Sequence, residues 1–221
     1  MDLPAVVAAY LIGSISFPWL IAWWHGIDLR SVGSRKLGGG NLASVLGVRH
    51  GVLGGGLDAL KGALVILVAA ALGLPVEIRV LCGIAAVAGQ IWPVFHDLDG
   101  GRANATGWGV VLVLDIIAAS IAAIPLVLAV VMRYRVRPPP RRVVPLASIL
   151  TFLVWSAVIY EIDGVTPTVV GGLVIFALVL VRRLTAGLGD DLRTRASLFR
   201  ILLNRALYDR SELQESGAVP V

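Results

Sequence analysis

Residues 107–132 read GWGVVLVLDIIAASIAAIPLVLAVVM, and the number of times that this apolar stretch crosses a membrane decides the fold. A membrane-spanning helix needs about 20 mostly apolar residues, because the hydrocarbon core is about 30 Å thick and a helix rises about 1.5 Å per residue. The stretch therefore fits either one long tilted helix or two short helices of roughly 12 residues, about 18 Å each. The charges on either side of it decide between these two interpretations.

The rest of the chain has the composition of a membrane protein. Of its 221 residues, 57% are hydrophobic and only 15% are charged, which is too little charge to cover a soluble domain of this length. The first apolar stretch follows Asp2 and has no basic segment before it, so we expect a retained helix and not a cleaved signal peptide. The expected hydrophobic segments are residues 4–24, 52–72, 78–95, 107–118, 121–132, 144–160 and 167–181.

The distribution of basic residues indicates how these segments are oriented. If the N-terminus lies outside, the loop 26–50 and the segment 96–106 fall on the cytoplasmic side, where basic residues gather. One crossing by residues 107–132 would place the five arginines of 133–142 outside, whereas two crossings keep them inside. The sequence therefore predicts an all-α membrane bundle of about seven hydrophobic segments, with the N-terminus outside and the C-terminus in the cytoplasm.

The chain is expected to divide into a transmembrane bundle, residues 1–184, and a cytoplasmic tail, residues 185–221. The cytoplasmic loops of the bundle are residues 26–50, 96–106 and 133–142. Arginines in the tail alternate with apolar residues, which is typical of an amphipathic helix that lies on the membrane surface. This helix acts either as an anchor alone or as part of an active site, and the sequence leaves both interpretations open.

Glycines and cations are concentrated in the first two of these loops. Residues 32–41 read VGSRKLGGGN, where the glycines allow backbone N–H groups to approach an anion and Arg35 and Lys36 add positive charge. The second loop repeats this combination at Gly100-Gly101-Arg102. Such loops are either phosphate-binding sites or flexible connections, and the first motif alone favours a connection.

Two ionisable residues, Asp58 and Lys61, lie within the expected second span. Their i, i+3 spacing places them on one face of the helix. Ionisable groups inside a membrane are costly and usually face the interior of the bundle in pairs. Asp58 and Lys61 are therefore either a structural ion pair or part of a polar site.

Several segments of the chain, taken in order, carry a resemblance to one protein family. They are AYLIGSISFP (9–18), GIDLRSVGS (26–34), Asn41 with VLG (45–47), LDALKG (57–62), PVF (93–95), Gly100-Gly101 and LASI (146–149). Together they resemble the bacterial acyl-phosphate:glycerol-3-phosphate acyltransferases of the PlsY type. The similarity covers most of the chain, up to about residue 200.

The resemblance implies a seven-helix enzyme of the plasma membrane whose site faces the cytoplasm. Such an enzyme transfers a fatty acyl group from acyl phosphate to the 1-hydroxyl of glycerol 3-phosphate, giving lysophosphatidate, the first step of phospholipid synthesis. The resemblance implies no metal or other cofactor. Acyl phosphate is already activated, so the protein mainly positions its substrates and stabilises charge. Beyond these substrates and membrane lipids, the sequence indicates no nucleic-acid partner, because the basic residues lack base-stacking aromatics, and it identifies no protein partner.

The motifs assign expected roles to individual residues. Catalytic roles are expected for Ser34, Asn41 and Arg102. Substrate binding is expected for Arg35, Lys36, Gly38, Gly39, Asp58, Lys61, Gly100, Gly101, Ser148, Arg195 and Arg200.

The chain also departs from the family pattern. Arg35, Lys36 and Gly40 stand in place of glycine, asparagine and threonine, Ser44 in place of an arginine, and Gln90 in place of a histidine. Arg102-Ala103-Asn104 replaces Lys-Gly-Val, and Thr194 and Ser197 replace a histidine and an asparagine of the tail motif. A second interpretation is therefore a catalytically impaired paralogue that serves as a lipid-binding or assembly subunit. A small transporter is disfavoured, because the chain shows no paired inverted repeat with broken helices.

Overall fold

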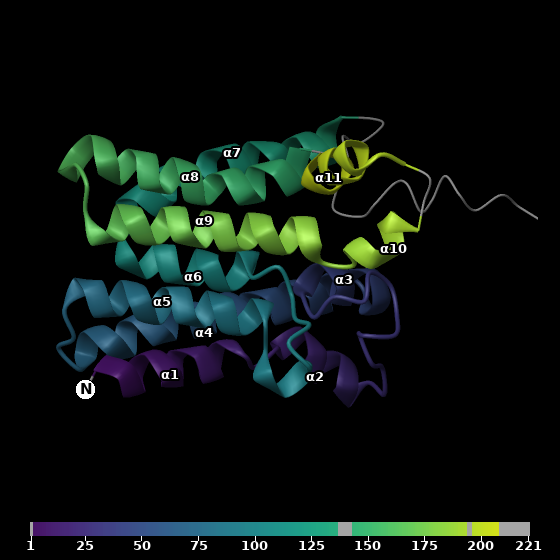
Figure 1. Ribbon diagram of the computed structural model, residues 1–221, viewed down its shortest axis with the longest axis horizontal. Coiled ribbons are helices and arrows are strands. Elements are labelled where there is room, and N and C mark those ends of the chain that lie inside the picture. Colours follow the sequence, from purple (N-terminus) through teal and green to yellow (C-terminus); the bar gives the residue numbers. More distant parts are fainter. Residues whose placement is uncertain (1, 137–142, 194–195, 208–221) are drawn as a thin grey trace, which may run out of the picture.

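The computed structural model describes residues 2–136, 143–193 and 196–207, and its regular elements are all helical (Figure 1). In chain order they are α1 Asp2–Gly13, α2 Phe17–Trp24, α3 Gly39–Leu46, α4 Val48–Ala71, α5 Val76–Ile91, the 3₁₀ turn Val94–His96, α6 Asn104–Leu114, α7 Ile116–Arg135, α8 Val143–Asp163, α9 Pro167–Thr185, α10 Leu188–Leu192 and α11 Leu198–Leu207. Within the described residues, six segments are long and apolar enough to cross a membrane, and α6 is a shorter apolar helix. The predicted all-α bundle is confirmed in this outline.

The first apolar segment was predicted as one helix over residues 4–24, and the structure divides it into α1 and α2. Ser16 begins α2, because its side-chain oxygen accepts a hydrogen bond from the backbone N–H of Trp19 at 3.2 Å. The interruption leaves the carbonyl of Ile15 free to accept from the Lys61 ammonium, and the N–H of Phe17 donates to Asp58 Oδ1 at 3.4 Å. The break therefore supplies backbone partners to the buried ionisable pair.

Residues 107–132 belong to two helices, but the predicted break near residues 119–120 was wrong. The break lies at Asp115, whose carboxylate accepts from the N–H of Ala118 at 2.8 Å and so caps the start of α7. The predicted length was also wrong for the second helix, since α7 has 20 residues and continues through Pro125 to Arg135. Only α6, with 11 residues, is as short as expected.

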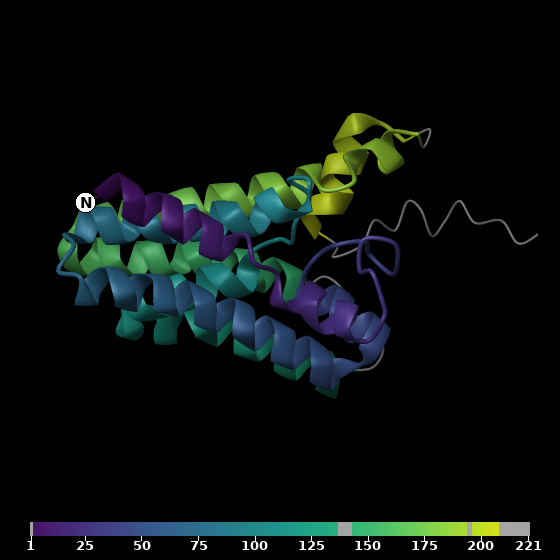
Figure 2. The same ribbon diagram turned by 90° about the horizontal axis from the view of Figure 1, so that it is seen from below.

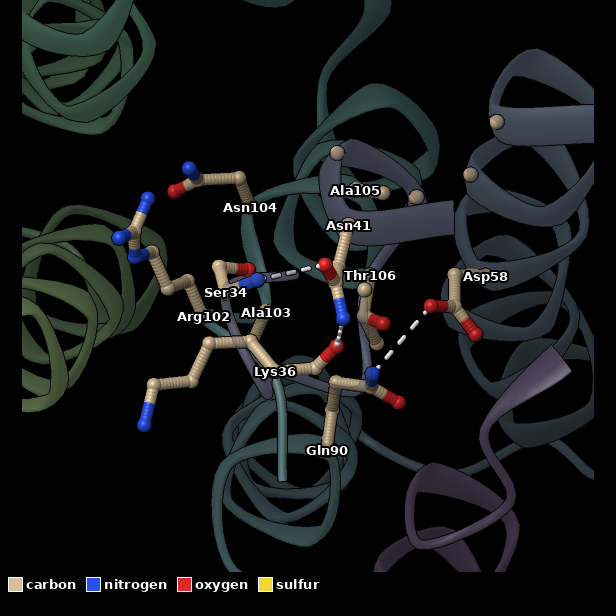
Figure 3. Close-up of a pocket in the computed structure, with 15 residues that line it drawn as sticks. Ser34, Lys36, Asn41, Asp58, Gln90, Arg102, Ala103, Asn104, Ala105 and Thr106 are labelled. Atoms are coloured by element: carbon tan, nitrogen blue, oxygen red, sulfur yellow. Dashed lines mark hydrogen bonds between the residues drawn. The ribbon is translucent and has the colours of Figure 1, made fainter. Parts of the chain in front are cut away.

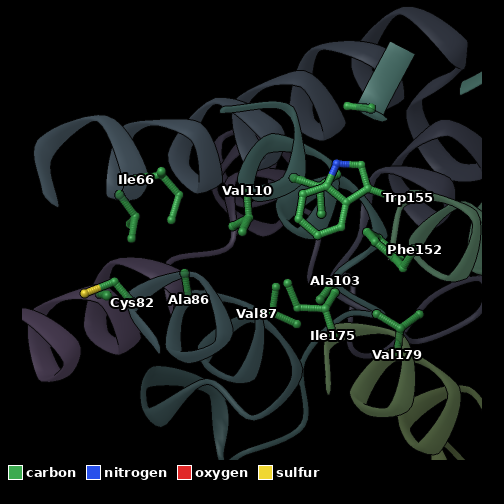
Figure 4. Close-up of a cluster of buried hydrophobic side chains, with 14 of the residues drawn as sticks. Ile66, Cys82, Ala86, Val87, Ala103, Val110, Phe152, Trp155, Ile175 and Val179 are labelled. Atoms are coloured by element: carbon green, nitrogen blue, oxygen red, sulfur yellow. The ribbon is translucent and has the colours of Figure 1, made fainter. Parts of the chain in front are cut away.

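Helices α4 and α6 approach each other backbone to backbone, and a compact apolar core fills the space beside them. A Cβ atom on Gly109 would lie 1.8 Å from the carbonyl oxygen of Ala59, so only glycine allows this approach. Phe152 and Trp155 of α8 are fully buried in the core (Figure 4). By contrast, large apolar side chains of α4 and α7 face outward, which is expected of a bundle whose exterior contacts lipid.

The connecting segments gather at two opposite ends of the bundle (Figures 1 and 2). The N-terminus, the α4–α5 turn and the α8–α9 turn lie at one end. The other end, called the polar end below, holds α2, α3, α10, α11 and the segment between α5 and α6. Loop 26–50, segment 96–106 and the described part of the tail thus share one end, while residues 137–142 of the third predicted loop lie outside the described residues.

The helix expected in the tail is α11, and it is fastened to the bundle. The Arg205 guanidinium donates to the carbonyl of Ala186 at 2.6 and 3.1 Å, and Arg183 Nε donates to the carbonyl of Arg205 at 3.0 Å. Leu198 and Phe199 remain exposed at the start of the helix. Its contact with a membrane surface stays a prediction.

Candidate functional site

A cavity of about 290 Å³ lies at the polar end, between α3, α4, the end of α5 and the start of α6 (Figure 3). The predicted residues that line it are Ser34, Lys36, Gly38, Gly39, Asn41, Asp58 and Arg102. The structure thus brings together residues that are up to 68 positions apart in the sequence, from Ser34 to Arg102. The cavity is also lined by residues that were given no role, among them Gln90, Asn104 and Thr106.

Asn41 holds the first loop in shape. Its side-chain oxygen accepts from the N–H of Ser34 at 2.8 Å. Its side-chain nitrogen lies 3.1 Å from each of three carbonyl oxygens, those of Leu29, Val32 and Lys36. Because the amide is committed to the loop backbone, the structure gives Asn41 a positioning role: it presents Ser34 and Lys36 to the cavity.

Two helices begin at the cavity without a side-chain cap. Gly38 precedes α3 and Ala103 precedes α6, and neither supplies a capping side chain. The first N–H groups of a helix carry partial positive charge and have no partner within the helix. Two such starts at one cavity favour an anionic ligand, and a phosphate group fits this environment well.

Cationic side chains add to this positive character. Arg102 and half-buried Lys36 line the cavity. Burial lowers the pKa of the Lys36 ammonium below its usual value, and the charge of Asp99 opposes this shift. Nearby guanidinium groups, those of Arg182, Arg102 and Arg205, lower this pKa further. An anion bound here would relieve that repulsion.

At the cavity wall, Asp58 and Gln90 form a buried network with Lys61, which lies behind them. The Lys61 ammonium donates to Asp58 Oδ1 at 2.9 Å and also to Gln90 Oε1. Gln90 Nε2 donates to Asp58 Oδ2 at 3.2 Å and to the carbonyl of Leu37 at 3.1 Å (Figure 3). Gln90 therefore connects the ion pair of α4 to the first loop, so the glutamine found in place of the family's histidine has a complete set of partners.

Arg182, near the end of α9, was missed by the sequence interpretation. Its guanidinium donates to the carbonyls of Gly100 at 2.8 Å and Gly101 at 3.3 Å, and it pairs with the Asp99 carboxylate. It therefore fixes the loop that leads into α6. The sequence signal for this role was the pair of arginines at the end of the last apolar segment. The positive-inside rule explains such a pair equally well, so the pair did not indicate a site residue.

The other predicted residues lie outside the cavity lining. Gly100 and Gly101 join α5 to the cavity wall through hydrogen bonds from their N–H groups to the carbonyls of Ile91 and Gln90. Lys61 lies behind Asp58, and Ser148 of α8 contacts Asn104. Arg35 and Arg200 are exposed, and Arg195 lies outside the described residues.

Comparison with known proteins identifies the family. The profile of the family described as "Glycerol-3-phosphate acyltransferase" matches residues 3–186. A protein of that name from Parasynechococcus marenigrum is 35% identical over 80% of this chain and 84% of its own length. "Glycerol-3-phosphate acyltransferase 5" from Dehalococcoides mccartyi is 40% identical over 52% of this chain, and the chain spans only 50% of the length of that relative.

Solved structures agree with this assignment. The glycerol 3-phosphate form of PlsY (YgiH), described as an integral membrane glycerol 3-phosphate acyltransferase, is 30% identical. It superposes with a TM-score of 0.73 over 91% of this chain and 98% of its own. A second structure of PlsY, in its lysophosphatidic acid form, is 29% identical with a TM-score of 0.72. This chain is a multi-pass membrane protein that belongs to the glycerol-3-phosphate acyltransferase family.

Proposed function

We propose that this protein transfers a fatty acyl group from acyl phosphate to glycerol 3-phosphate and so forms lysophosphatidate. The observation that carries the proposal is the cavity in which two uncapped helix starts meet Lys36 and Arg102. Both proposed substrates bear phosphate, and backbone N–H groups with guanidinium and ammonium groups are the donors that bind it. The apolar bundle beside the cavity offers a lipid-like environment for the acyl chain.

The proposed reaction forms a bond between the hydroxyl oxygen of the acceptor and the acyl carbon, and breaks the bond from that carbon to the phosphate oxygen. The hydroxyl proton leaves with inorganic phosphate, which balances the reaction. Asp58 is the one carboxylate that lines the described cavity, and both of its oxygens are already hydrogen-bonded. Catalysis therefore depends on positioning and on charge stabilisation, with Ser34 and Arg102 as the catalytic candidates that face the substrates.

We also propose that the cavity faces the cytoplasm and that the chain makes seven passes, with α6 as a short one. The concentration of arginines at the polar end supports this orientation. In this arrangement α11 lies on the cytoplasmic side, where Arg200 would approach an anionic membrane surface or the substrates.

One assay tests the proposed reaction. Purified protein is mixed with palmitoyl phosphate and glycerol 3-phosphate, and the release of inorganic phosphate and lysophosphatidate is measured. We expect turnover by the wild type, a loss of roughly a hundredfold or more in Arg102→Ala, and little change in the control Arg133→Ala on the exposed end of α7. Palmitoyl-coenzyme A in a parallel reaction tests the donor. Turnover with palmitoyl-coenzyme A alone would contradict the proposed donor, and absence of turnover with both donors would contradict the proposed acyl transfer.

A further inference from the structure

Asn104 is the first residue of α6, and its side chain lies at the edge of the cavity next to that of Arg102 (Figure 3). The two side chains extend in the same direction from the loop before α6. The resemblance places a valine at this position, so the amide is a feature of this chain. A group that binds Arg102 would therefore lie close to the Asn104 amide.

The orientation of that amide follows from its neighbour on α8. The hydroxyl of Ser148 has one proton and donates it to the carbonyl of Pro145 at 2.9 Å. Ser148 Oγ can then only accept from Asn104, and Asn104 Nδ2 lies 3.4 Å from it. The amide nitrogen therefore faces Ser148, which leaves Asn104 Oδ1 on the other side.

Asn104 Oδ1 is a buried hydrogen-bond acceptor, and no donor in the described part of the chain pairs with it. Such a group is costly, because its hydrogen bonds with water are lost on folding and nothing replaces them. Thr106 Oγ1, further along α6 on the same cavity wall, is likewise buried and unpaired among the described residues. Asn104 Oδ1 can only accept a hydrogen bond, so a ligand that pairs with it must supply a donor, whereas the Thr106 hydroxyl can either donate or accept.

We propose that Asn104 Oδ1 accepts a hydrogen bond from the middle hydroxyl of the glycerol 3-phosphate acceptor. This inference rests on the proposed acyl transfer. An ionised phosphate only accepts hydrogen bonds, so it pairs with Arg102 and not with an amide oxygen. The middle hydroxyl is on the carbon next to the phosphate-bearing carbon, which brings it beside Asn104 once Arg102 holds the phosphate. Asn104 is then a specificity-determining residue that selects a diol phosphate over a simple alcohol phosphate.

The test compares glycerol 3-phosphate with 3-hydroxypropyl phosphate, which keeps the phosphate and the reacting hydroxyl but lacks the middle hydroxyl. We expect the wild type to favour glycerol 3-phosphate by roughly tenfold in kcat/KM, as one hydrogen bond to a buried acceptor allows. Asn104→Val, which introduces the residue of the family pattern, should bring this ratio near one. Asn104→Asp keeps an acceptor oxygen, and its charge repels both phosphates equally, so it should keep the ratio while raising both KM values.

A matched control and a second readout make the result decisive. Ser120→Val, on the exposed face of α7, should keep the wild-type ratio. Isothermal titration with the two acceptors gives the same comparison without turnover, so failure of the acyl transfer would leave this test intact. Equal ratios in the wild type and Asn104→Val, by kinetics or by titration, would overturn the proposal.

Discussion

At the scale of single residues, Lys36 makes the proposed activity sensitive to alkaline pH. Its folded-state pKa is lowered by burial, so its ammonium loses its proton at a lower pH than an ordinary lysine does. The phosphate of glycerol 3-phosphate is already fully ionised above pH 7, so only the protein titrates there. As pH rises through the lowered pKa, kcat/KM for glycerol 3-phosphate should fall by roughly tenfold or more, because a charged hydrogen bond is lost.

Lys36→Arg provides the matched comparison for this pH profile. A guanidinium stays charged throughout the range, so the alkaline fall should disappear even if the variant is less active at pH 7. The measurement is kcat/KM, because this ratio reports the protonation of the free enzyme. Identical profiles for the wild type and Lys36→Arg would show that another group controls the alkaline limb.

Arg35 occupies a backbone conformation that suits glycine. Its φ angle is +56°, and the family pattern has a glycine at this position. A residue with a side chain costs about 1–2 kcal/mol in this left-handed region. Replacement by glycine recovers only part of this cost, because glycine loses more conformational entropy on folding. Arg35→Gly should therefore have a free energy of unfolding roughly 0.5–1 kcal/mol above that of Arg35→Ala, which also lacks the guanidinium but keeps a Cβ in this conformation; thermal denaturation in detergent measures the difference. The control Arg49→Gly, in the first turn of α4, should lower stability, and equal effects of both changes would contradict the argument.

At the scale of elements, Arg182 joins α9 to the loop before α6. One lysine ammonium cannot reproduce the two carbonyl contacts and the Asp99 pair that the planar guanidinium makes. Arg182→Lys should therefore lower kcat/KM by roughly tenfold, since misplacement of the loop shifts Arg102 and Asn104. Arg133→Lys is the control, as it changes the same residue type on an exposed surface. Unchanged kinetics in Arg182→Lys would refute the positioning role.

The start of α7 depends on one side chain. Asp115→Ala removes the cap on the N–H of Ala118 and should lower the free energy of unfolding by about 1 kcal/mol. Asp115→Asn retains an acceptor oxygen and should remain within a few tenths of a kcal/mol of the wild type. A thermal denaturation series of the three proteins checks the order. If Asp115→Asn and Asp115→Ala lowered stability equally, the carboxylate would matter through its charge rather than as a cap.

The same elements show what the sequence predicts and where it stops. Apolar length and charge located the spans, because each depends on the local sequence alone. An aspartate within an apolar run is a capping signal, so the sequence does contain the information that places the break at Asp115. A prediction from hydropathy alone does not use this signal. The contacts of Arg182 with Gly100 and Gly101 join residues about 80 positions apart, and local patterns carry no information on such distances. The motifs predicted the cavity residues. They did not show that Asn41 binds the backbone of the loop, whereas Arg102 lines the cavity as a cation.

At the scale of the whole molecule, the bundle separates its surfaces by chemistry. Its sides present large apolar residues, and one of its ends holds the cavity, α11 and the segments that carry most of the described arginines. For the proposed activity, this separation would let one site meet a water-soluble phosphate and an acyl chain that stays in lipid. The proposed activity also requires a defined orientation, because a cavity that faced away from the cytoplasm would not reach cytoplasmic glycerol 3-phosphate.

Cysteine labelling in intact cells tests this orientation. Val165, in the α8–α9 turn, is 78% exposed and lies at the end opposite the cavity, whereas Arg30 is exposed at the polar end. The native Cys82 is only 2% exposed, so it contributes little background. A membrane-impermeant maleimide should label Val165→Cys from outside, and it should label Arg30→Cys only after the cells are permeabilised. The reverse pattern would place the cavity on the outer face and would remove the physical basis for a cytoplasmic acceptor, whereas labelling of both sites from outside would contradict the separation of the two ends across the membrane.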